Sequence, residues 1–291
     1  MSDEPRFPPN LVMLVSIVAV STASILIRWS DAPAVIIAMY RMIISVVMLL
    51  PFFIRNDGVA KLRKRGARDI LGLIGVGVVL AIHFASWITS LDMTSVASSV
   101  VFVHIDPIFV ALVSHFFLKE RINGRVLAGI VISLVGVMII ALGDAGASEV
   151  SLMGDLLALV GGLMLGIYLL GGRMFRRDLD LTTYVVPVYS SAAVVLILMS
   201  LFTGAPVIGY ASRDYILFFL IALVPMILGH TLYNWALRYV SAPVVSVSLL
   251  GEPVGASILA FFLLNEVPGN QVIFGGVVTL AGILLSSYRS E

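Results

Sequence analysis

Ten segments of the sequence are apolar, almost free of charge and roughly 20 residues long. An α-helix rises about 1.5 Å per residue and the hydrocarbon core of a membrane is about 30 Å thick, so a helix of this length crosses it once. The sequence therefore predicts an all-α polytopic membrane protein with ten transmembrane helices. The expected spans are residues 10–27, 34–54, 69–90, 94–118, 125–143, 152–172, 182–203, 214–237, 241–264 and 269–288.

The composition agrees with a membrane protein. Of the 291 residues, 60% are hydrophobic and only 12% are charged, whereas a soluble domain has about 25% charged residues. A β-barrel would show short segments of alternating hydrophobicity instead of continuous apolar runs. The connections between the spans are too short for a soluble domain, which predicts a single transmembrane domain over residues 1–291. The N-terminal stretch lacks the basic start and cleavage site of a removable signal peptide, so we expect none.

Lysine and arginine are distributed unevenly over the connections. If the spans alternate in direction, fifteen of the 18 basic residues fall on the side that holds both termini, and only Arg28 and Arg213 fall on the other. The remaining one, Arg41, lies inside a span. Because connections rich in lysine and arginine stay in the cytoplasm, we expect a protein of the inner membrane with cytoplasmic N- and C-termini.

Two parts of the sequence superpose when one is shifted by 146 residues. The stretch SLDMTSVASSVVFVHIDPIFVALVSHFFLKER then lies over ALRYVSAPVVSVSLLGEPVGASILAFFLLNEV. We therefore predict two repeats, residues 10–143 and 152–288, with five spans each. An odd number of spans turns the second repeat upside down, and inverted repeats with a binding site near the midplane are the plan of many secondary transporters.

These features together resemble the EamA-type transporters of the drug/metabolite transporter superfamily. The resemblance rests on the duplicated acid-proline span, on IRWSDAPAVIIAMYR at the exit of the first span, and on LRYVSAPVVSVSLLGEPV in the second half. The chain departs from the family pattern at Asp106 and at Val267. The resemblance implies export of small metabolites through a cavity enclosed by spans one to four and six to nine, with spans five and ten at the periphery. Within the family, the chain looks most like bacterial exporters of aromatic amino acids.

Each half carries an acid-proline pair inside an otherwise uncharged span, Asp106-Pro107 in the first and Glu252-Pro253 in the second. An ionised carboxylate at the membrane centre costs about 3 kcal/mol on insertion scales, so it normally faces a bundle interior or a wet cavity. Proline removes a backbone donor and kinks a helix. We therefore interpret these four residues as the hinge or gate of each half. For the two acids, this structural role is favoured over direct contact with a substrate or proton.

A stripe of small and hydroxyl residues leads up to each acid. Its members are Ser95, Ser99, Phe102 and Asp106 in the first half, and Ser241, Val245, Ser248 and Glu252 in the second. On a helix this spacing forms one face, which predicts that Ser99 and Ser248 contact the substrate. The alternative is that the serines only allow close packing of helices.

Arg41 is the only basic side chain deep inside a predicted span. It could form an ion pair with an acid inside the bundle or attract a substrate carboxylate. Alternatively, its long side chain could extend to the outer surface of the membrane. We favour the internal ion pair and count Arg41 among the candidate substrate-binding residues.

Aromatic and imidazole side chains occur at related positions of the two halves. His83 and Trp87 are one turn apart on the third span, and His230 and Tyr233 are three residues apart on the eighth, while Tyr168 lies on the sixth. A cavity with such walls could stack flat organic substrates, so all five are candidate substrate-binding residues. The alternative for Trp87 is an anchor at the membrane interface, where tryptophan is common.

The sequence lacks the motifs of the main rival classes. It has no cysteine, no phosphate-binding loop, no H-E-x-x-H and no G-x-S-x-G, so we expect no cofactor, no metal and no enzyme activity. His104 and His115 are interpreted as packed residues. A membrane enzyme would need a clustered acid, base and nucleophile, and a channel would need a continuous polar pore. The net charge of +1 gives no reason to expect a nucleic-acid partner.

The sequence therefore predicts a monomeric secondary transporter in the lipid bilayer. It would export small amphipathic solutes, in particular aromatic or other large neutral amino acids, by alternating access through a central cavity. The alternative within the same superfamily is an exporter of multiple drugs or of another metabolite.

Overall fold

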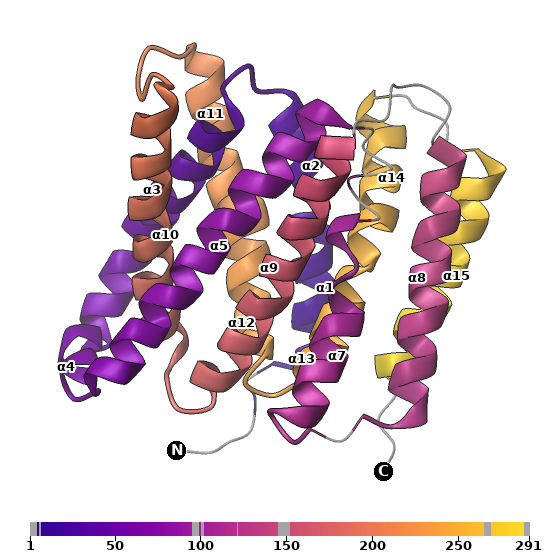
Figure 1. The fold of residues 1–291 in the computed structure, drawn as a ribbon, viewed down its shortest axis with the longest axis horizontal. Coiled ribbons are helices and arrows are strands. Elements are labelled where there is room, and N and C mark those ends of the chain that lie inside the picture. Colours follow the sequence, from indigo (N-terminus) through magenta and orange to yellow (C-terminus); the bar gives the residue numbers. More distant parts are fainter. Residues whose placement is uncertain are drawn as a thin grey trace.

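The computed structural model describes residues 5, 7–94, 99, 102–120, 122–144, 152–264 and 269–287, and every regular element in this part of the chain is a helix. Most of the helices extend along one common direction and pack side by side in a bundle (Figure 1). The predicted all-α class is confirmed for these residues.

Seven helical segments of the described chain are long and apolar enough to cross a membrane, judged by length and composition. They are α1 with α2 (Pro9–Val20, Ala23–Arg28), α3 (Ala34–Arg55), α5 (Ala67–Met93), α9 (Leu152–Arg176), α10 (Leu181–Thr203), the series α11, η1 and α12 (Ser212–Ile221, Ala222–Thr231, Leu232–Ala236), and α13 with α14 (Ala242–Leu249, Gly251–Leu264). The other three predicted spans contain α7 (Asp106–Phe116), α8 (Gly124–Asp144) and α15 (Asn270–Ser287). Their apolar segments are shorter, at Asp106–Phe116, Gly124–Ile140 and Asn270–Ser286. Residues 95–98 of the fourth predicted span lie outside the described residues.

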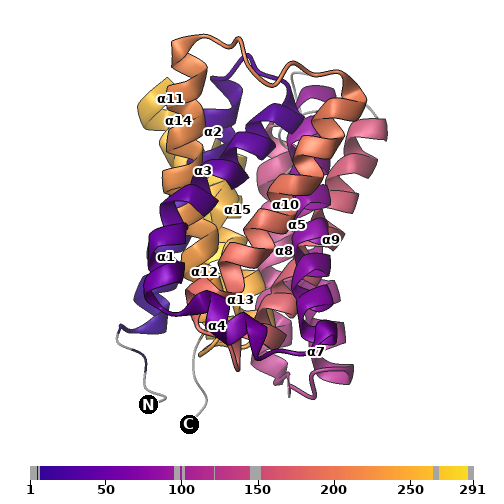
Figure 2. The same cartoon turned by 90° about the vertical axis from the view of Figure 1, so that its left-hand side faces the viewer.

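One end of the bundle carries a short helix, α4 (Gly58–Arg63), which connects α3 to α5. Figure 2 shows α4 lying across this end, where α1 also begins and α15 ends. Arg173 and Arg177, in the last turn of α9 and just beyond it, lie at the same end. We call it the basic end, and the other the opposite end.

An ion pair holds α4 against the start of α10. Lys61 Nζ lies 2.7 Å from Asp180 Oδ2, and the Asp180 side chain also caps α10 by accepting from the backbone N–H of Thr183. Burial raises the pKa of the Asp180 carboxyl, but the hydrogen bonds from Lys61 and from Thr183 outweigh burial and hold the pKa at about 2. Asp180 is therefore ionised at neutral pH and fixes the connection between the second and third spans.

Both acid-proline pairs lie at breaks between helices. His104 and Ile105 form a turn before α7, and Pro107 is the second residue of that helix. Leu250 separates α13 from α14, and Pro253 is the third residue of α14. The expectation that each proline kinks a continuous helix is therefore wrong in both halves. Each helix ends before its proline, because proline is tolerated in a first turn, where its missing N–H would have no partner within the helix.

The eighth span contains a π-helix, η1, that the sequence did not predict. Within it, Thr231 Oγ1 donates to the carbonyl oxygen of Met226 five residues earlier, at 3.1 Å. The carbonyl oxygen of Pro225 accepts a hydrogen bond from Arg41 Nη2 at 3.3 Å. Segments of π-helix occur frequently at functional sites, and here the segment carries His230.

The helices α8 and α15 run antiparallel at one edge of the bundle (Figure 1). Their backbones meet at glycines: a Cβ atom on Gly129 would lie 2.6 Å from the carbonyl oxygen of Gly282, and one on Gly136 would lie 2.7 Å from that of Gly275. The reverse contacts, from Gly282 to Gly129 and from Gly275 to Gly136, are also 2.7 Å. Gly129 and Gly275, like Gly136 and Gly282, are 146 residues apart. The two helices therefore contact one another through equivalent surfaces.

Candidate solute site

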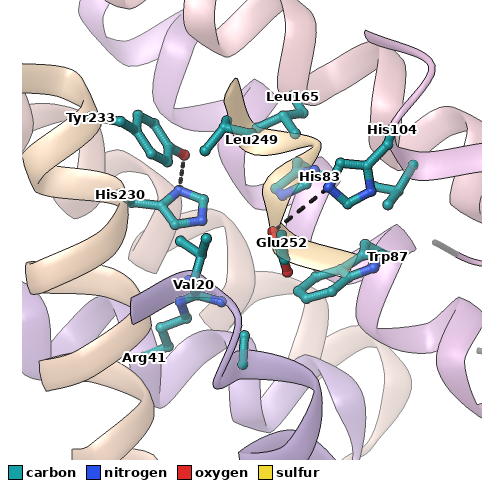
Figure 3. Close-up of a pocket in the computed structure, with 12 residues that line it drawn as sticks. Val20, Arg41, His83, Trp87, His104, Leu165, His230, Tyr233, Leu249 and Glu252 are labelled. Carbon is teal, nitrogen blue, oxygen red and sulfur yellow. Dashed lines mark hydrogen bonds and ion pairs between the residues drawn. The ribbon is translucent and has the colours of Figure 1, made fainter. Parts of the chain in front are cut away.

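A small cavity lies inside the bundle at the level of the two helix breaks. Its volume is about 20 Å³, which leaves room for about one water molecule. Both halves of the chain supply its walls (Figure 3). The polar and aromatic side chains among them are Arg41, His83, Trp87, His104, His230, Tyr233 and Glu252. Within the described residues, no group of three or more His, Asp or Glu could hold a metal ion.

Arg41 on α3 reaches the cavity from one side and is fully buried. Its Nη2 donates to the carbonyl oxygen of Pro225, and its guanidinium carbon lies 4.1 Å from the ring centre of Phe84. Its Nε and Nη1 have no hydrogen-bond partner, and no carboxylate forms an ion pair with it, among the residues that the structure describes. The expectation that Arg41 forms an internal ion pair is therefore wrong. The alternative, that its side chain extends to the membrane surface, is also wrong, because the side chain is fully buried.

His83 and Trp87 form one wall of the cavity from α5. Their rings are stacked, with an interplanar angle of 6° and centroids 6.1 Å apart. His83 Nδ1 is 2.8 Å from the carbonyl oxygen of Gly161 on α9, which fixes the orientation of the imidazole. Trp87 is only 5% exposed. It is thus part of the interior, and its alternative interpretation as an interfacial anchor is wrong.

His230 and Tyr233 line the cavity on the side of Arg41 (Figure 3). The Tyr233 hydroxyl is hydrogen-bonded to His230 Nδ1, and the two rings are 4.7 Å apart. Tyr168 lies behind them and does not border the cavity, with its ring 6.2 Å from His230 and its hydroxyl accepting from Asn234 Nδ2 at 2.6 Å. The structure therefore brings four of the five aromatic and imidazole candidates to the cavity and sets Tyr168 one layer away.

Glu252 borders the cavity from the start of α14, and its side chain is 19% exposed. Its Oε2 lies 3.7 Å from Nε2 of His104, which belongs to the other half of the chain. His104 is buried at the cavity, so the sequence-based interpretation as a merely packed residue missed it. A signal was present, because His104 comes two residues before the acid-proline pair. His115, also expected to be packed, is exposed.

The other candidate residues lie away from the cavity. Asp106 is fully buried and accepts a hydrogen bond from Ser246 on α13, and Pro107 and Pro253 are buried without bordering the cavity.

Ser99 and Ser248 are buried away from the cavity too. The Ser99 hydroxyl is hydrogen-bonded to that of Ser90, and the Ser248 hydroxyl donates to the carbonyl oxygen of Val244. The prediction that the two serines contact the substrate is corrected, since the stripe assumed one continuous helix through each break.

Between the cavity and the basic end lies a layer of fully buried tyrosines. Tyr168, Tyr184 and Tyr189 belong to it, and the Tyr189 hydroxyl lies 3.1 Å from Thr231 Oγ1. Arg176 Nε donates to the carbonyl oxygen of Asn234 at 3.0 Å. We call the three tyrosine side chains the tyrosine layer, and neither they nor Arg176 border the cavity.

A second arginine joins three helices at the basic end. Arg173 Nε donates to Glu120 Oε1 at 2.6 Å, and its Nη1 donates to the carbonyl oxygen of Leu237 at 2.7 Å. Arg177 Nη2 reaches the same carboxylate oxygen at 3.1 Å. These bonds tie the chain after α7 to the end of α9 and to the chain after α12.

A helical bundle with membrane-spanning segments and a buried polar cavity defines a multi-pass membrane protein, and sequence comparison specifies which kind. The model of the EamA-like transporter family matches residues 8–142 and, separately, residues 152–288. The two matches cover nearly the whole chain, so the protein belongs to the EamA-like transporter family. It is a transporter and not an enzyme.

Several curated proteins are similar along most of their length. An uncharacterized transporter of Archaeoglobus fulgidus is 24% identical over 264 residues, covering 88% of both chains. The uncharacterized transporter YyaM of Bacillus subtilis strain 168 is 27% identical over 266 residues, covering 86% of this chain and 83% of its own. A protein of Streptantibioticus cattleyicolor named "Probable terminal-alkyne amino-acid exporter" is 26% identical over 193 residues, covering 65% of this chain and 63% of its own.

A solved structure shares the fold. A chain titled "Crystal structure of protein" superposes with a TM-score of 0.75 and covers 96% of both chains, at 16% sequence identity. At this identity the match shows the arrangement of the helices and carries no information about the solute.

Proposed function

We propose that the protein is a secondary transporter that exports aromatic or other large neutral amino acids by alternating access. One observation carries the proposal: a buried cavity between the two halves combines stacked aromatic and imidazole rings with one guanidinium group and one carboxylate. Flat rings suit an apolar, planar solute side chain. The amino-acid exporter among the relatives is consistent with this class of solute.

We propose further that residues 10–143 and 152–288 are inverted repeats. The contacts between α8 and α15 support this arrangement, because Gly129 meets Gly282 while Gly136 meets Gly275. Reciprocal contacts between equivalent residues are what a two-fold axis produces. Since the two helices run antiparallel (Figure 1), such an axis would lie in the membrane plane. The two separate family matches also support a duplication.

Alternating access requires the cavity to change its size and its exposure. At about 20 Å³ it is far smaller than the several hundred Å³ of typical ligand pockets. A solute can therefore enter only if helices move. In this proposal the breaks at Asp106-Pro107 and Glu252-Pro253 are the hinges, and the cavity wall consists of Arg41, His83, Trp87, His230 and Tyr233. Tyr168, Ser99 and Ser248 support this wall from behind.

The proposed orientation places the basic end in the cytoplasm. Connections rich in lysine and arginine remain on the cytoplasmic side of the inner membrane, and the order of the predicted spans assigns fifteen of the 18 basic residues to this side. Both termini would then be cytoplasmic, and the tyrosine layer would close the cavity toward the cytoplasm. Because both halves of the cavity belong to one chain, we propose that a monomer transports.

Transport by purified protein in lipid vesicles tests the function. Vesicles loaded with unlabelled phenylalanine should take up labelled phenylalanine, tryptophan and leucine by exchange. Trp87→Ala and Tyr233→Ala should reduce this exchange at least tenfold at equal protein content. Trp235→Ala is the matched control, because Trp235 packs against Tyr239 outside the cavity and should retain exchange. Vesicles that move quaternary ammonium drugs but no amino acid would replace the proposal with multidrug export.

A further inference from the structure

We infer that the cavity recognises the two charges of a zwitterion separately and thereby fixes its orientation. The Arg41 guanidinium would bind the carboxylate, and Glu252, next to His104, would bind the ammonium group. The solute side chain would then lie along the stacked rings of His83 and Trp87. This inference rests on the proposed function and specifies how its solute is selected.

The first support is the unused hydrogen-bonding capacity of Arg41. A guanidinium group has five N–H donors in a planar fork that matches a carboxylate. In the described structure only Nη2 donates, to the carbonyl of Pro225, while Nε and Nη1 have no partner. A fully buried cation without a counter-ion is strongly destabilising. The free donors of a buried arginine on the wall of a cavity therefore indicate an anionic group as the missing partner.

The second support is the position of Glu252. Its carboxylate borders the same cavity and stays partly exposed, at 19% of the side-chain surface. The separation of 3.7 Å from His104 Nε2 is longer than a hydrogen bond. A carboxylate has about four lone-pair positions for donors, so it can accept from an ammonium group without losing a tight existing bond.

The third support is the balance of charge within the cavity. The cavity wall carries one arginine, Arg41, and one carboxylic acid, Glu252, whose charges have opposite signs. A cationic drug would be attracted by Glu252 but repelled by Arg41. An anion would be attracted by Arg41 but repelled by Glu252. Only a solute with both charges complements both groups. Both groups border the same cavity, so a single solute bound there would contact both.

A set of phenylalanine analogues tests this inference in the wild-type protein. Vesicles exchange labelled L-phenylalanine in competition with unlabelled L-phenylalanine, phenylalanine amide or 3-phenylpropionate. The amide lacks the carboxylate and 3-phenylpropionate lacks the ammonium group, while all three keep the same ring. We expect each altered analogue to compete at least tenfold less well than phenylalanine. Equal competition by the amide would overturn the role of Arg41, and equal competition by 3-phenylpropionate would overturn that of Glu252.

Variants then assign each charge to its residue. Arg41→Gln should remove the preference for phenylalanine over its amide, and Glu252→Gln should remove the preference over 3-phenylpropionate. Each preference is a ratio within one protein sample, so a change in the amount of folded protein does not alter it. Arg176→Gln is the matched control, because Arg176 is also a buried arginine but does not border the cavity. Its two ratios should equal those of the wild type.

The outcomes separate this inference from the proposed function. Exchange of amino acids without discrimination among the analogues would overturn the fixed orientation and leave amino-acid transport standing. No exchange of any amino acid by the wild-type protein would overturn both. If Arg41→Gln does not fold, Arg41→Lys keeps the charge without the planar fork, and the wild-type analogue series decides the question by itself.

Discussion

The two acid-proline breaks share a sequence pattern and a place in their halves, yet their acids have different surroundings. Asp106 is fully buried and accepts a hydrogen bond from Ser246 of the other half. Glu252 is partly exposed at the cavity and faces His104 of the other half at 3.7 Å. Each acid thus faces a residue of the other half, but only Glu252 borders the cavity. A repeated motif therefore need not keep one role in both copies.

The helices beside the two breaks are also packed differently. A Cβ atom on Gly162 of α9 would lie 2.6 Å from the carbonyl oxygen of Val103, just before the first break, so backbone meets backbone. In the second half, the glycine belongs to the broken span, and a Cβ atom on Gly255 would lie 2.7 Å from the Cβ atom of Ser21 and closer still to its Oγ. The Ser21 hydroxyl can rotate away, whereas the Ser21 Cβ atom and the carbonyl oxygens of Val103 and Phe102 move only with the backbone. We infer that the first break, which packs against Gly162 through two carbonyl groups, is the stiffer of the two hinges and that α14 moves more than α7.

Gly162→Ala should produce the largest loss of stability. Its methyl group would meet the carbonyl oxygens of Val103 and Phe102, at 2.6 and 2.8 Å, and could fit only if α9 moves away. Overpacking of this severity costs about 3 kcal/mol. The midpoint of thermal unfolding of the purified protein in detergent should fall by about 6–12 °C.

The matching change in the second half should be milder and reversible. Gly255→Ala should cost about 2 kcal/mol, and Ser21→Gly in the same protein should restore the wild-type midpoint, because it removes both atoms that the methyl group meets. A loss as large as that of Gly162→Ala, with no rescue by Ser21→Gly, would contradict the difference between the two hinges.

Replacing the prolines tests which hinge moves more during transport. Both lie in the first turn of a helix, so alanine restores few hydrogen bonds, and each variant should unfold within about 1 kcal/mol of the wild type. Pro253→Ala should lower the rate of exchange about tenfold, because conformational steps often limit turnover. Pro107→Ala should lower it less than threefold, by roughly 0.6 kcal/mol of barrier. Measured at equal protein content, the reverse order would make α7 the moving element.

Double-mutant cycles compare how strongly each acid joins the halves, and give the smallest expected effect. Asp106→Asn with Ser246→Ala should show a coupling energy of about 1 kcal/mol, because a buried hydrogen bond is lost. Glu252→Gln with His104→Gln should show less than about 0.5 kcal/mol, since 3.7 Å is too long for a hydrogen bond. Unfolding in detergent measures both. Equal coupling energies for the two pairs would mean that Glu252 stabilises the contact between the halves as much as Asp106 does. The sequence alone favoured such a structural role for both acids.

The sequence predicted the all-α class, and seven of the ten expected spans are long and apolar enough in the described chain to cross a membrane, since an apolar run of sufficient length determines a membrane helix locally. Glycines in the segments GLMLG, residues 162–166, and GEPVG, residues 251–255, lie against neighbouring helices. The sequence identified Arg41, His83, Trp87, His230 and Tyr233, because polar or aromatic residues at related positions are conspicuous in apolar spans. All five border the cavity.

The errors in the site have one physical cause. Extrapolating a stripe from Ser99 to Asp106, or from Ser248 to Glu252, assumes a helix of constant twist, and both helices break in between. A break changes the direction of every side chain before it relative to those after it. The serines therefore turned away from the cavity, and His104, within the first break, turned toward it.

The sequence by itself determined that this chain is a helical membrane protein with a duplicated pattern, because hydrophobic length and residue spacing act within one segment. Tertiary structure alone decided that Arg41 has free donors and no ion pair, that the eighth span widens into a π-helix, and that Glu252 but not Asp106 reaches the cavity. These features depend on which groups of distant segments meet, and the surroundings of a buried charge are supplied by its neighbours in space.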